Sequence, residues 1–300
     1  MVKAKVQSNE AKIKRQSLLR KVFGQCAIWI VLLLMYVPIL VLIASSFTDA
    51  DVIGQWNGFS FELYARLFQS EEIGIALANT IVLALLSASI ATLLGTLGAV
   101  GTFYSKKVWQ SICENVTQIP VVNAEIVIAL SLTVLFVFAG NAIFGGANLF
   151  SFWTLLIGHV ILAVPFVYLS VKPKLQQMDP ALYEAALDLG CTQKQALFKA
   201  TLPEILPGIA SGFLLSITLS LDDFIVTAFT RGSGLFSGEK TIETLSTLVQ
   251  AKIKKGPIPP EMRALTTFIF LAVLILVVGV TIYRNVKNGQ SKHRRGRRAK

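Results

Sequence analysis

The sequence predicts an all-α integral membrane protein with six transmembrane helices and both termini in the cytoplasm. The 300 residues are 54% hydrophobic and only 15% charged, whereas a soluble domain carries roughly 25% charged residues. Of the 28 lysines and arginines, seven lie in residues 1–24 and eight in residues 284–300. Because loops and tails on the cytoplasmic side are rich in basic residues, these two clusters indicate cytoplasmic ends.

Six apolar runs are long enough to cross a bilayer, which takes roughly 20 helical residues. They cover residues 26–47, 79–104, 116–139, 151–171, 207–230 and 263–283. We therefore expect a basic cytoplasmic tail over 1–25, a six-span domain over 26–283 and a second basic tail over 284–300. The loop charges agree with this orientation, except that loop 231–262 should lie outside but holds five basic residues. Part of that loop could be re-entrant or interfacial.

The net charge of +11 does not indicate nucleic acid, since about half of the basic residues lie in the tails. We expect contact with membrane lipid and no nucleic-acid partner.

The cysteines Cys26, Cys113 and Cys191 are scattered, which argues against a disulfide framework or a zinc site. A lone histidine, His159, is expected to have a satisfied role in the core rather than to bind a metal. The first apolar run is too long for a cleaved signal peptide.

A polar segment at 179–203, between the fourth and fifth runs, has the pattern of two short helices. Asp179 is a good N-cap, and Pro180 suits the first helical position. Leu182, Ala185, Ala186 and Leu189 would then form one apolar stripe. Gly190 would end this helix, and Thr192 with Gln195 would cap a second one that Pro203 closes. We call residues 179–203 the elbow and expect it to dock on another protein, although an amphipathic helix lying on the membrane surface is an alternative.

The elbow residues Glu184-Ala185-Ala186, Gly190 and Leu202-Pro203 resemble the cytoplasmic "EAA" loop of binding-protein-dependent ABC transporter permeases. The resemblance implies the type I importer (MetI-like) permease fold. It also implies that the elbow is the coupling helix that docks in a groove of an ATP-binding subunit. Family members usually carry Ile two positions before the Leu-Pro pair, where this chain has Ala200, and this mild departure leaves docking expected.

Further residues narrow the resemblance to the PotC-like permease subunit of polyamine (spermidine/putrescine) importers. The segment 56–60, the span around His159 and the segment 220–224 are similar to that group. The resemblance implies a bacterial inner (plasma) membrane location and a small polycationic substrate. The implied partners are a second homologous permease, two copies of an ATP-binding subunit and an extracytoplasmic substrate-binding protein. The chain would then be a non-catalytic permease without a cofactor, because ATP binds to the partner subunit.

Asp222 and Asp223 can also be interpreted without the resemblance. A carboxylate at the bilayer centre costs roughly 2.5–3.5 kcal/mol, so it persists where it meets water, a partner or a cation. Neighbouring helical residues point about 100° apart, so at most one of the two can face a central pathway. The other would pair with a neighbouring helix or a backbone group, and a buried structural network is an alternative for both.

Two more residues are candidates for the substrate pathway. Glu125 in the third span is as compatible with a core hydrogen bond as with a substrate contact. Trp56 in the first outer loop could stack on a cationic substrate, but anchoring at the membrane interface is the favoured role.

Other function classes remain as alternatives. The first is a permease for another solute, such as ferric ion, an anion or an amino acid. The second is an ion-coupled secondary transporter, which commonly contains inverted repeats, and no convincing repeat is present here. A glycine-rich stretch at 232–241 is not a phosphate-binding loop, because Glu239 separates the glycine from the lysine that such a loop requires.

Overall fold

The structure, a computed structural model, describes residues 2–50, 54–234, 238–255, 259–271, 273–275 and 278, with side chains 2–23 and 233–240 excepted. It divides into two compact units. The first unit holds Met1–Gln69 and Pro257–Lys300, and the second holds Ser70–Gly256.

The first unit contains two helices with defined bounds and part of a third. They are α1 (Val2–Ser46), α2 (Glu62–Gln69) and a helix over residues 260–271. Within α1, Gly24–Ser46 is apolar enough to cross a membrane, which matches the predicted first span. Of the predicted sixth span, 263–283, residues 263–271, 273–275 and 278 are described, and the predicted tail 284–300 lies outside the described residues.

Arg263 holds the end of α1 within the first unit. Its guanidinium donates hydrogen bonds to the carbonyl oxygens of Ala50, at 2.5 Å, and Ser45, at 3.5 Å. The last carbonyls of a helix have no partner inside the helix, and a cation there also interacts favourably with the helix dipole. A buried arginine, 2% exposed, is therefore stabilised where the polypeptide leaves α1.

The second unit carries the remaining elements. Its helices are α3 (Glu71–Phe103), α4 (Lys107–Val122), α5 (Glu125–Ala142), α6 (Phe152–Gln177), α7 (Pro180–Asp188), α8 (Gln193–Ala196), η1 (Leu197–Thr201), α9 (Leu202–Asp222), α10 (Ile225–Thr230) and α11 (Leu245–Lys255). A short antiparallel ribbon pairs β1 (Ser233–Gly234) with β2 (Gly238–Thr241). The predicted all-α fold class is confirmed, with this ribbon as an addition inside the loop 231–262.

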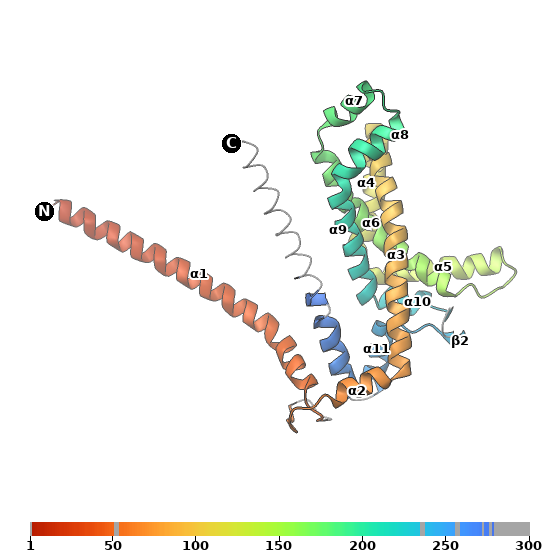
Figure 1. Cartoon of the computed structure of the whole chain (residues 1–300), viewed down its shortest axis with the longest axis horizontal. Coiled ribbons are helices and arrows are strands. Elements are labelled where there is room, and N and C mark those ends of the chain that lie inside the picture. The colour runs from red at the N-terminus through yellow and green to blue at the C-terminus, as the bar shows by residue number, and fades with distance from the viewer. Residues whose placement is uncertain are drawn as a thin grey trace. The chain divides into compact units, whose positions relative to one another are not determined.

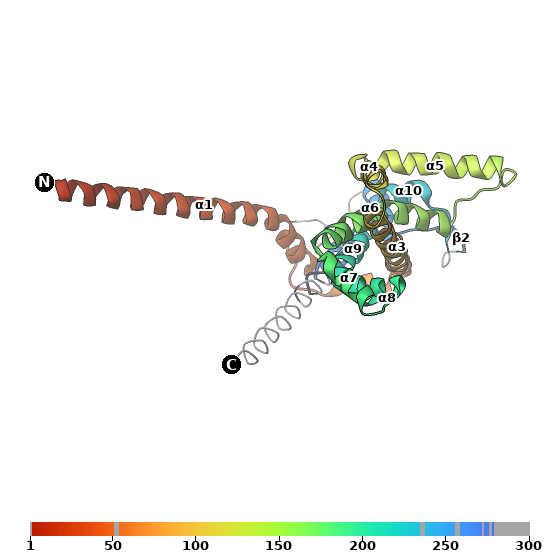
Figure 2. The same ribbon diagram turned by 90° about the horizontal axis from the view of Figure 1, so that it is seen from above.

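Helices α3, α6 and α9 form the central bundle of the second unit and pack on one another (Figures 1 and 2). Small residues allow the close approach: a Cβ added at Gly95 of α3 would lie 2.7 Å from the Cβ of Val167 on α6. Helices α7 and α8 lie at one end of the bundle and α10 and α11 at the other, while α5 projects sideways (Figure 1).

Five helices among the described residues are long and apolar enough to cross a membrane. Three of them correspond to the first, second and fourth predicted spans. The other two correspond to the third and fifth predicted spans, with different boundaries. The third span was predicted as one helix over 116–139, and this is wrong. Asn123 and Ala124 have extended backbones, so α4 ends and α5 begins inside the predicted run.

The cause of this break is local. Pro120, inside α4, lacks an N–H group and cannot donate to the carbonyl of Val116, which weakens the last turns of α4. The apolar run 116–139 continues across the break, so hydropathy alone does not reveal it, although α4 as a whole is less hydrophobic than α5. Consequently Glu125 lies in the first turn of α5 rather than in the middle of a continuous span.

The predicted fifth span, 207–230, is also interrupted. Helix α9 begins earlier, at Leu202, and ends at Asp222. Asp223 is extended, with ψ near 122°, and the short helix α10 follows it. The acidic pair therefore lies at a helix end.

The second helix of the elbow does not end at Pro203, contrary to the prediction. Helix α8 continues through the π-helical turn η1 into α9, and Pro203 lies in the first turn of α9. In η1 the N–H group of Leu202 donates to the carbonyl of Leu197, five residues back. This wider turn accommodates a proline that would clash with the carbonyl four residues earlier in a regular α-helix.

Candidate functional site

Asp223 is a buried cap of α10. Its side chain is 1% exposed. Its carboxylate accepts hydrogen bonds from the backbone N–H groups of Val226, at 3.3 Å, and Thr227, at 2.9 Å, and from the Thr227 hydroxyl at 3.1 Å. These N–H groups begin α10 and would otherwise have no acceptor. The buried charge is thus compensated by helix-terminal donors.

His159 connects this cap to the bundle. Its Nε2 lies 2.9 Å from the Thr227 hydroxyl and 3.6 Å from the Asp223 carboxylate, and its Nδ1 lies 2.8 Å from the Ser220 hydroxyl. Ser87 of α3 also donates to Ser220, at 3.2 Å. Side chains from α3, α6, α9 and α10 therefore share one buried polar network, and both ring nitrogens of His159 have a partner. The geometry fits the predicted core role of His159.

Asp222 points differently from its neighbour. Asp223 is buried, whereas Asp222 is exposed, because the helix ends at Asp222 and the backbone of Asp223 is extended. Asp222 is the last residue of α9, where the carbonyl groups give the helix its negative end. The structure therefore separates the two acids into one that holds the fold and one that is accessible.

Glu125 joins Asp222 as a second accessible acid. It is exposed at the first turn of α5, and α5 packs on α10, the helix that Asp223 caps. The first turn of α5 and the junction of α9 with α10 thus carry three of the predicted site residues. Trp56 belongs to the first unit, and 60% of its surface is exposed.

The elbow lies at the opposite end of the bundle from α10 (Figure 1). Asp179 caps α7 by accepting from the N–H of Ala181 at 3.0 Å, and Gly190 has a φ of +83°. Thr192 and Gln195 form the predicted capping box. These local predictions are confirmed, because caps and positive φ depend on residues a few positions apart.

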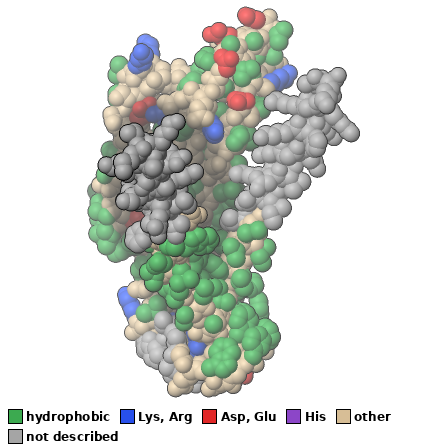
Figure 3. All heavy atoms as spheres, turned by 90° about the vertical axis from the view of Figure 1, so that its left-hand side faces the viewer, with side chains coloured by type: hydrophobic (Ala, Val, Ile, Leu, Met, Phe, Trp, Pro, Cys, Tyr) green, Lys and Arg blue, Asp and Glu red, His purple; other side chains and the backbone are tan. Residues whose placement is uncertain are grey.

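The surface of the elbow combines charge with exposed apolar side chains. Glu184 is exposed, as is Ala185, while Ala186 is half-buried. Leu182 is 46% exposed and Leu189 is 86% exposed. Acidic side chains gather at this end of the molecule, as Figure 3 shows. The elbow thus presents exposed apolar side chains next to charged ones at the end of α7.

An aromatic contact that the sequence did not reveal fixes the elbow to the bundle. The ring of Tyr104, directly after α3, lies 5.3 Å from the ring of Tyr183 on α7. The Tyr104 hydroxyl also shares a hydrogen bond of 3.3 Å with Thr201 in η1. These residues are 79 or more positions apart, and no local pattern joins them. These two contacts join the elbow to the end of α3.

Comparison with known proteins identifies the family of this chain. Residues 91–289 match the family described as "Binding-protein-dependent transport system inner membrane component". The chain belongs to this family. The matched region begins in α3 and includes α5, the elbow, α9 and α10, so it contains both groups of candidate residues except Trp56.

Curated members of this inner membrane component family include two relatives at 32% identity. One is the spermidine/putrescine transport system permease protein PotC of Escherichia coli K12, with 81% of this chain and 87% of that protein aligned. The other is the putrescine transport system permease protein PotI of the same strain, with 81% and 83% aligned. A solved bacterial ABC transporter that imports alginate has the same fold, with a TM-score of 0.67 at 23% identity over 89% of this chain and 93% of that one. The MetI-like importer permease fold is thus confirmed.

Proposed function

We propose that this family member is the permease subunit of an ATP-driven importer for polyamines such as spermidine and putrescine. The observation that carries the proposal is the pair of exposed acids, Asp222 and Glu125, at two helix ends. The names of the relatives PotC and PotI support the same cargo. The chain itself performs no covalent chemistry and needs no cofactor.

The chemistry of the acidic group suits a linear polycation. A polyamine carries ammonium groups separated by methylene chains, and each ammonium has several N–H donors and no acceptor. Asp222 and Glu125 supply carboxylate acceptors, and the carbonyl end of α9 adds negative potential. Asp223 acts as a positioning residue, because it caps α10 and so holds the end of α9 that carries Asp222.

The elbow would couple this chain to ATP hydrolysis on the partner subunit. The coupling residues are Glu184, Ala185, Ala186, Gly190, Leu202 and Pro203. An ATP-binding subunit would cover the exposed side chain of Leu189 and bind the ATP itself. Closure of two such subunits would move α7, and the contact of Tyr183 with Tyr104 would pass this movement to α3.

The proposed assembly contains a second homologous permease, two ATP-binding subunits and an extracytoplasmic substrate-binding protein. The alginate transporter with the same fold was solved in complex with a periplasmic protein that holds its oligosaccharide, which supports the last of these partners. In the bacterial inner membrane the chain would cross six times, leaving both termini and the elbow in the cytoplasm. Lipid surrounds it, and nucleic acid is not a partner.

Uptake of labelled spermidine by the complete transporter tests the proposal. Asp222→Asn and Glu125→Gln should each reduce uptake at least ~10-fold, because each removes a negative charge that meets the cation. The matched control is Glu71→Gln, which neutralises an exposed acid in the first turn of α3. Wild-type uptake by both variants would reassign the acids to structure. Uptake that survives ATP depletion would instead favour an ion-coupled transporter.

A further inference from the structure

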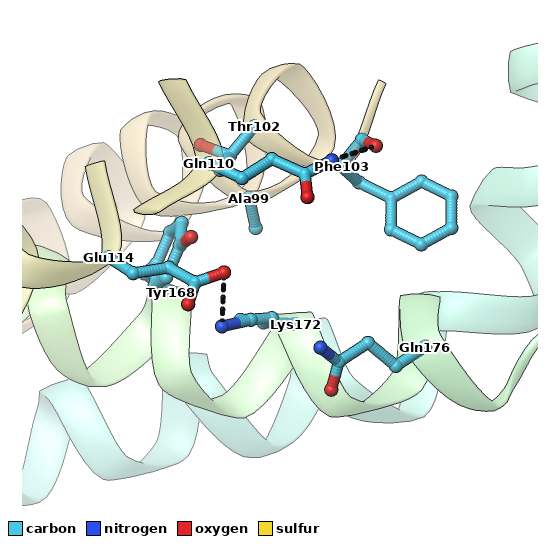
Figure 4. Close-up of a pocket in the computed structure, with 8 residues that line it drawn as sticks. All are labelled: Ala99, Thr102, Phe103, Gln110, Glu114, Tyr168, Lys172 and Gln176. Carbon is cyan, nitrogen blue, oxygen red and sulfur yellow. Dashed lines mark hydrogen bonds and ion pairs between the residues drawn. The ribbon is translucent and has the colours of Figure 1, made fainter. Parts of the chain in front are cut away.

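A two-part cavity lies between α3, α4 and α6. Its polar part, of about 120 Å³, includes Lys172, Glu114, Gln110 and Gln176 in its lining (Figure 4). Its apolar part, of about 240 Å³, includes Leu94, Gly98, Ile112, Val116 and Val164. Thr102 and Tyr168 line both parts. The two parts are therefore adjacent, on either side of Thr102 and Tyr168.

The two parts have a fixed order along the helices. The polar part is lined by Phe103, the last residue of α3, and by Gln176, next to the last residue of α6. The apolar part extends from Thr102 back to Leu94 on α3, which is roughly 12 Å at 1.5 Å per residue. The polar part thus lies at the elbow end of the bundle, and the apolar part runs toward the middle of the spans.

The polar part contains hydrogen-bonding groups with spare capacity. Lys172 Nζ lies 2.6 Å from Glu114 Oε1 (Figure 4). An ammonium has three donors and a carboxylate about four acceptor positions, so each can bind a second group while the ion pair persists. Among the described residues, the hydroxyl of Tyr168 is buried without a hydrogen-bond partner, on a side chain that is 4% exposed. Such a group costs free energy unless something satisfies it.

We propose that this cavity binds one phospholipid with a zwitterionic phosphate–ammonium headgroup, namely phosphatidylethanolamine. The phosphate accepts hydrogen bonds from Lys172 and Tyr168, and the ammonium donates to Glu114. One acyl chain follows the apolar part along α3 and α4. The neutral Lys172–Glu114 pair complements a zwitterion, whereas a polyamine would meet the repulsive charge of Lys172.

Gly98 allows a selective block of the apolar part. A Cβ added there would have only the Tyr168 ring near it, at 3.9 Å, so Gly98→Leu can extend into the cavity without meeting backbone. Gly101, three residues further along α3, is the matched control, since a Cβ added there meets nothing within 4 Å and the residue does not line either part. Tyr168→Phe removes only the unpartnered hydroxyl.

Native mass spectrometry of the full-length chain, titrated with lipids of identical acyl chains, tests the proposal. Wild type and Gly101→Leu should bind one phosphatidylethanolamine about 10-fold more tightly than phosphatidylcholine, whose ammonium has no N–H donor. Gly98→Leu should weaken binding at least ~10-fold, and Tyr168→Phe roughly 2- to 10-fold. Glu114→Gln should shift the preference toward phosphatidylglycerol.

Several results would overturn the assignment. If Gly98→Leu binds lipid as tightly as Gly101→Leu, the apolar part does not hold an acyl chain. If the three headgroups bind equally to wild type, the pairing with Lys172 and Glu114 is wrong. If binding disappears when the second permease is present, the cavity belongs to the subunit interface. Should Gly98→Leu fail to fold, Tyr168→Phe still decides the headgroup site. Polyamine uptake does not enter these measurements, so they stand apart from the proposed function.

Discussion

The imidazole of His159 lies 3.6 Å from the carboxylate of Asp223, and both side chains are 1% exposed. The two residues are 64 positions apart and come from α6 and the turn between α9 and α10. Asp223 also accepts hydrogen bonds from the first N–H groups of α10. The contact with His159 therefore positions the junction between α9 and α10. The accessible Asp222 owes its position to this buried pair.

Removal of the Asp223 carboxylate should destabilise the protein. Asp223→Ala takes the cap from α10 and leaves buried donors unpaired, so we expect a loss of about 2–4 kcal/mol in the free energy of unfolding. Thermal unfolding in detergent measures the effect. Asp222→Ala, at an exposed position, should change stability by no more than about 0.5 kcal/mol. Equal melting temperatures for the two variants would contradict the structural role of Asp223.

Substitution of Leu189 should weaken binding of the ATP-binding subunit without changing the stability of the chain. Because its side chain is 86% exposed, Leu189→Glu should leave the melting temperature unchanged. In the proposed assembly it should abolish co-purification of the ATP-binding subunit, since a charge would be buried at the interface without a partner. Leu189→Met keeps the apolar contact and serves as the control. Normal co-purification of Leu189→Glu would show that this part of the elbow does not dock.

The conformation of Gly190 leads to another prediction. At a φ of +83° an alanine is strained by roughly 1 kcal/mol, so Gly190→Ala should shift the connection between α7 and α8. We expect reduced ATPase activity of the complete transporter in proteoliposomes, with the chain still inserted in the membrane. Gly74→Ala, at a helical glycine with nothing within 4 Å of its added Cβ, should keep full activity. Unchanged ATPase activity in Gly190→Ala would argue against a defined elbow geometry.

Close packing of α3 on α6 can be tested at Gly95. Gly95→Ala would place a methyl group 2.7 Å from the Cβ of Val167 and 3.0 Å from the carbonyl oxygen of Val164. Overpacking of this kind costs about 1–3 kcal/mol, measurable as a lower melting temperature. Gly101→Ala on the same helix has open space and should be neutral or slightly stabilising. A neutral Gly95→Ala would mean that the two helices separate easily.

The elbow was predictable in detail because its signals are local. The cap by Asp179, the positive φ of Gly190 and the capping box of Thr192 and Gln195 involve residues at most three positions apart. The prediction failed at Pro203, where a π-helical turn absorbs a residue that a simple rule treats as a helix end. Hydropathy likewise located five spans but missed the breaks after Val122 and Asp222, because apolar residues lie on both sides of each break.

The sequence by itself determined the membrane class, the approximate spans and the caps of the elbow. Each of these depends on composition or on neighbours within one turn. Only the tertiary structure decided which acid is buried, that His159 and Ser87 join its network, and that α5, which begins at Glu125, packs on α10. These relationships depend on how separate helices pack, and contacts between distant residues leave no periodic signal in the chain.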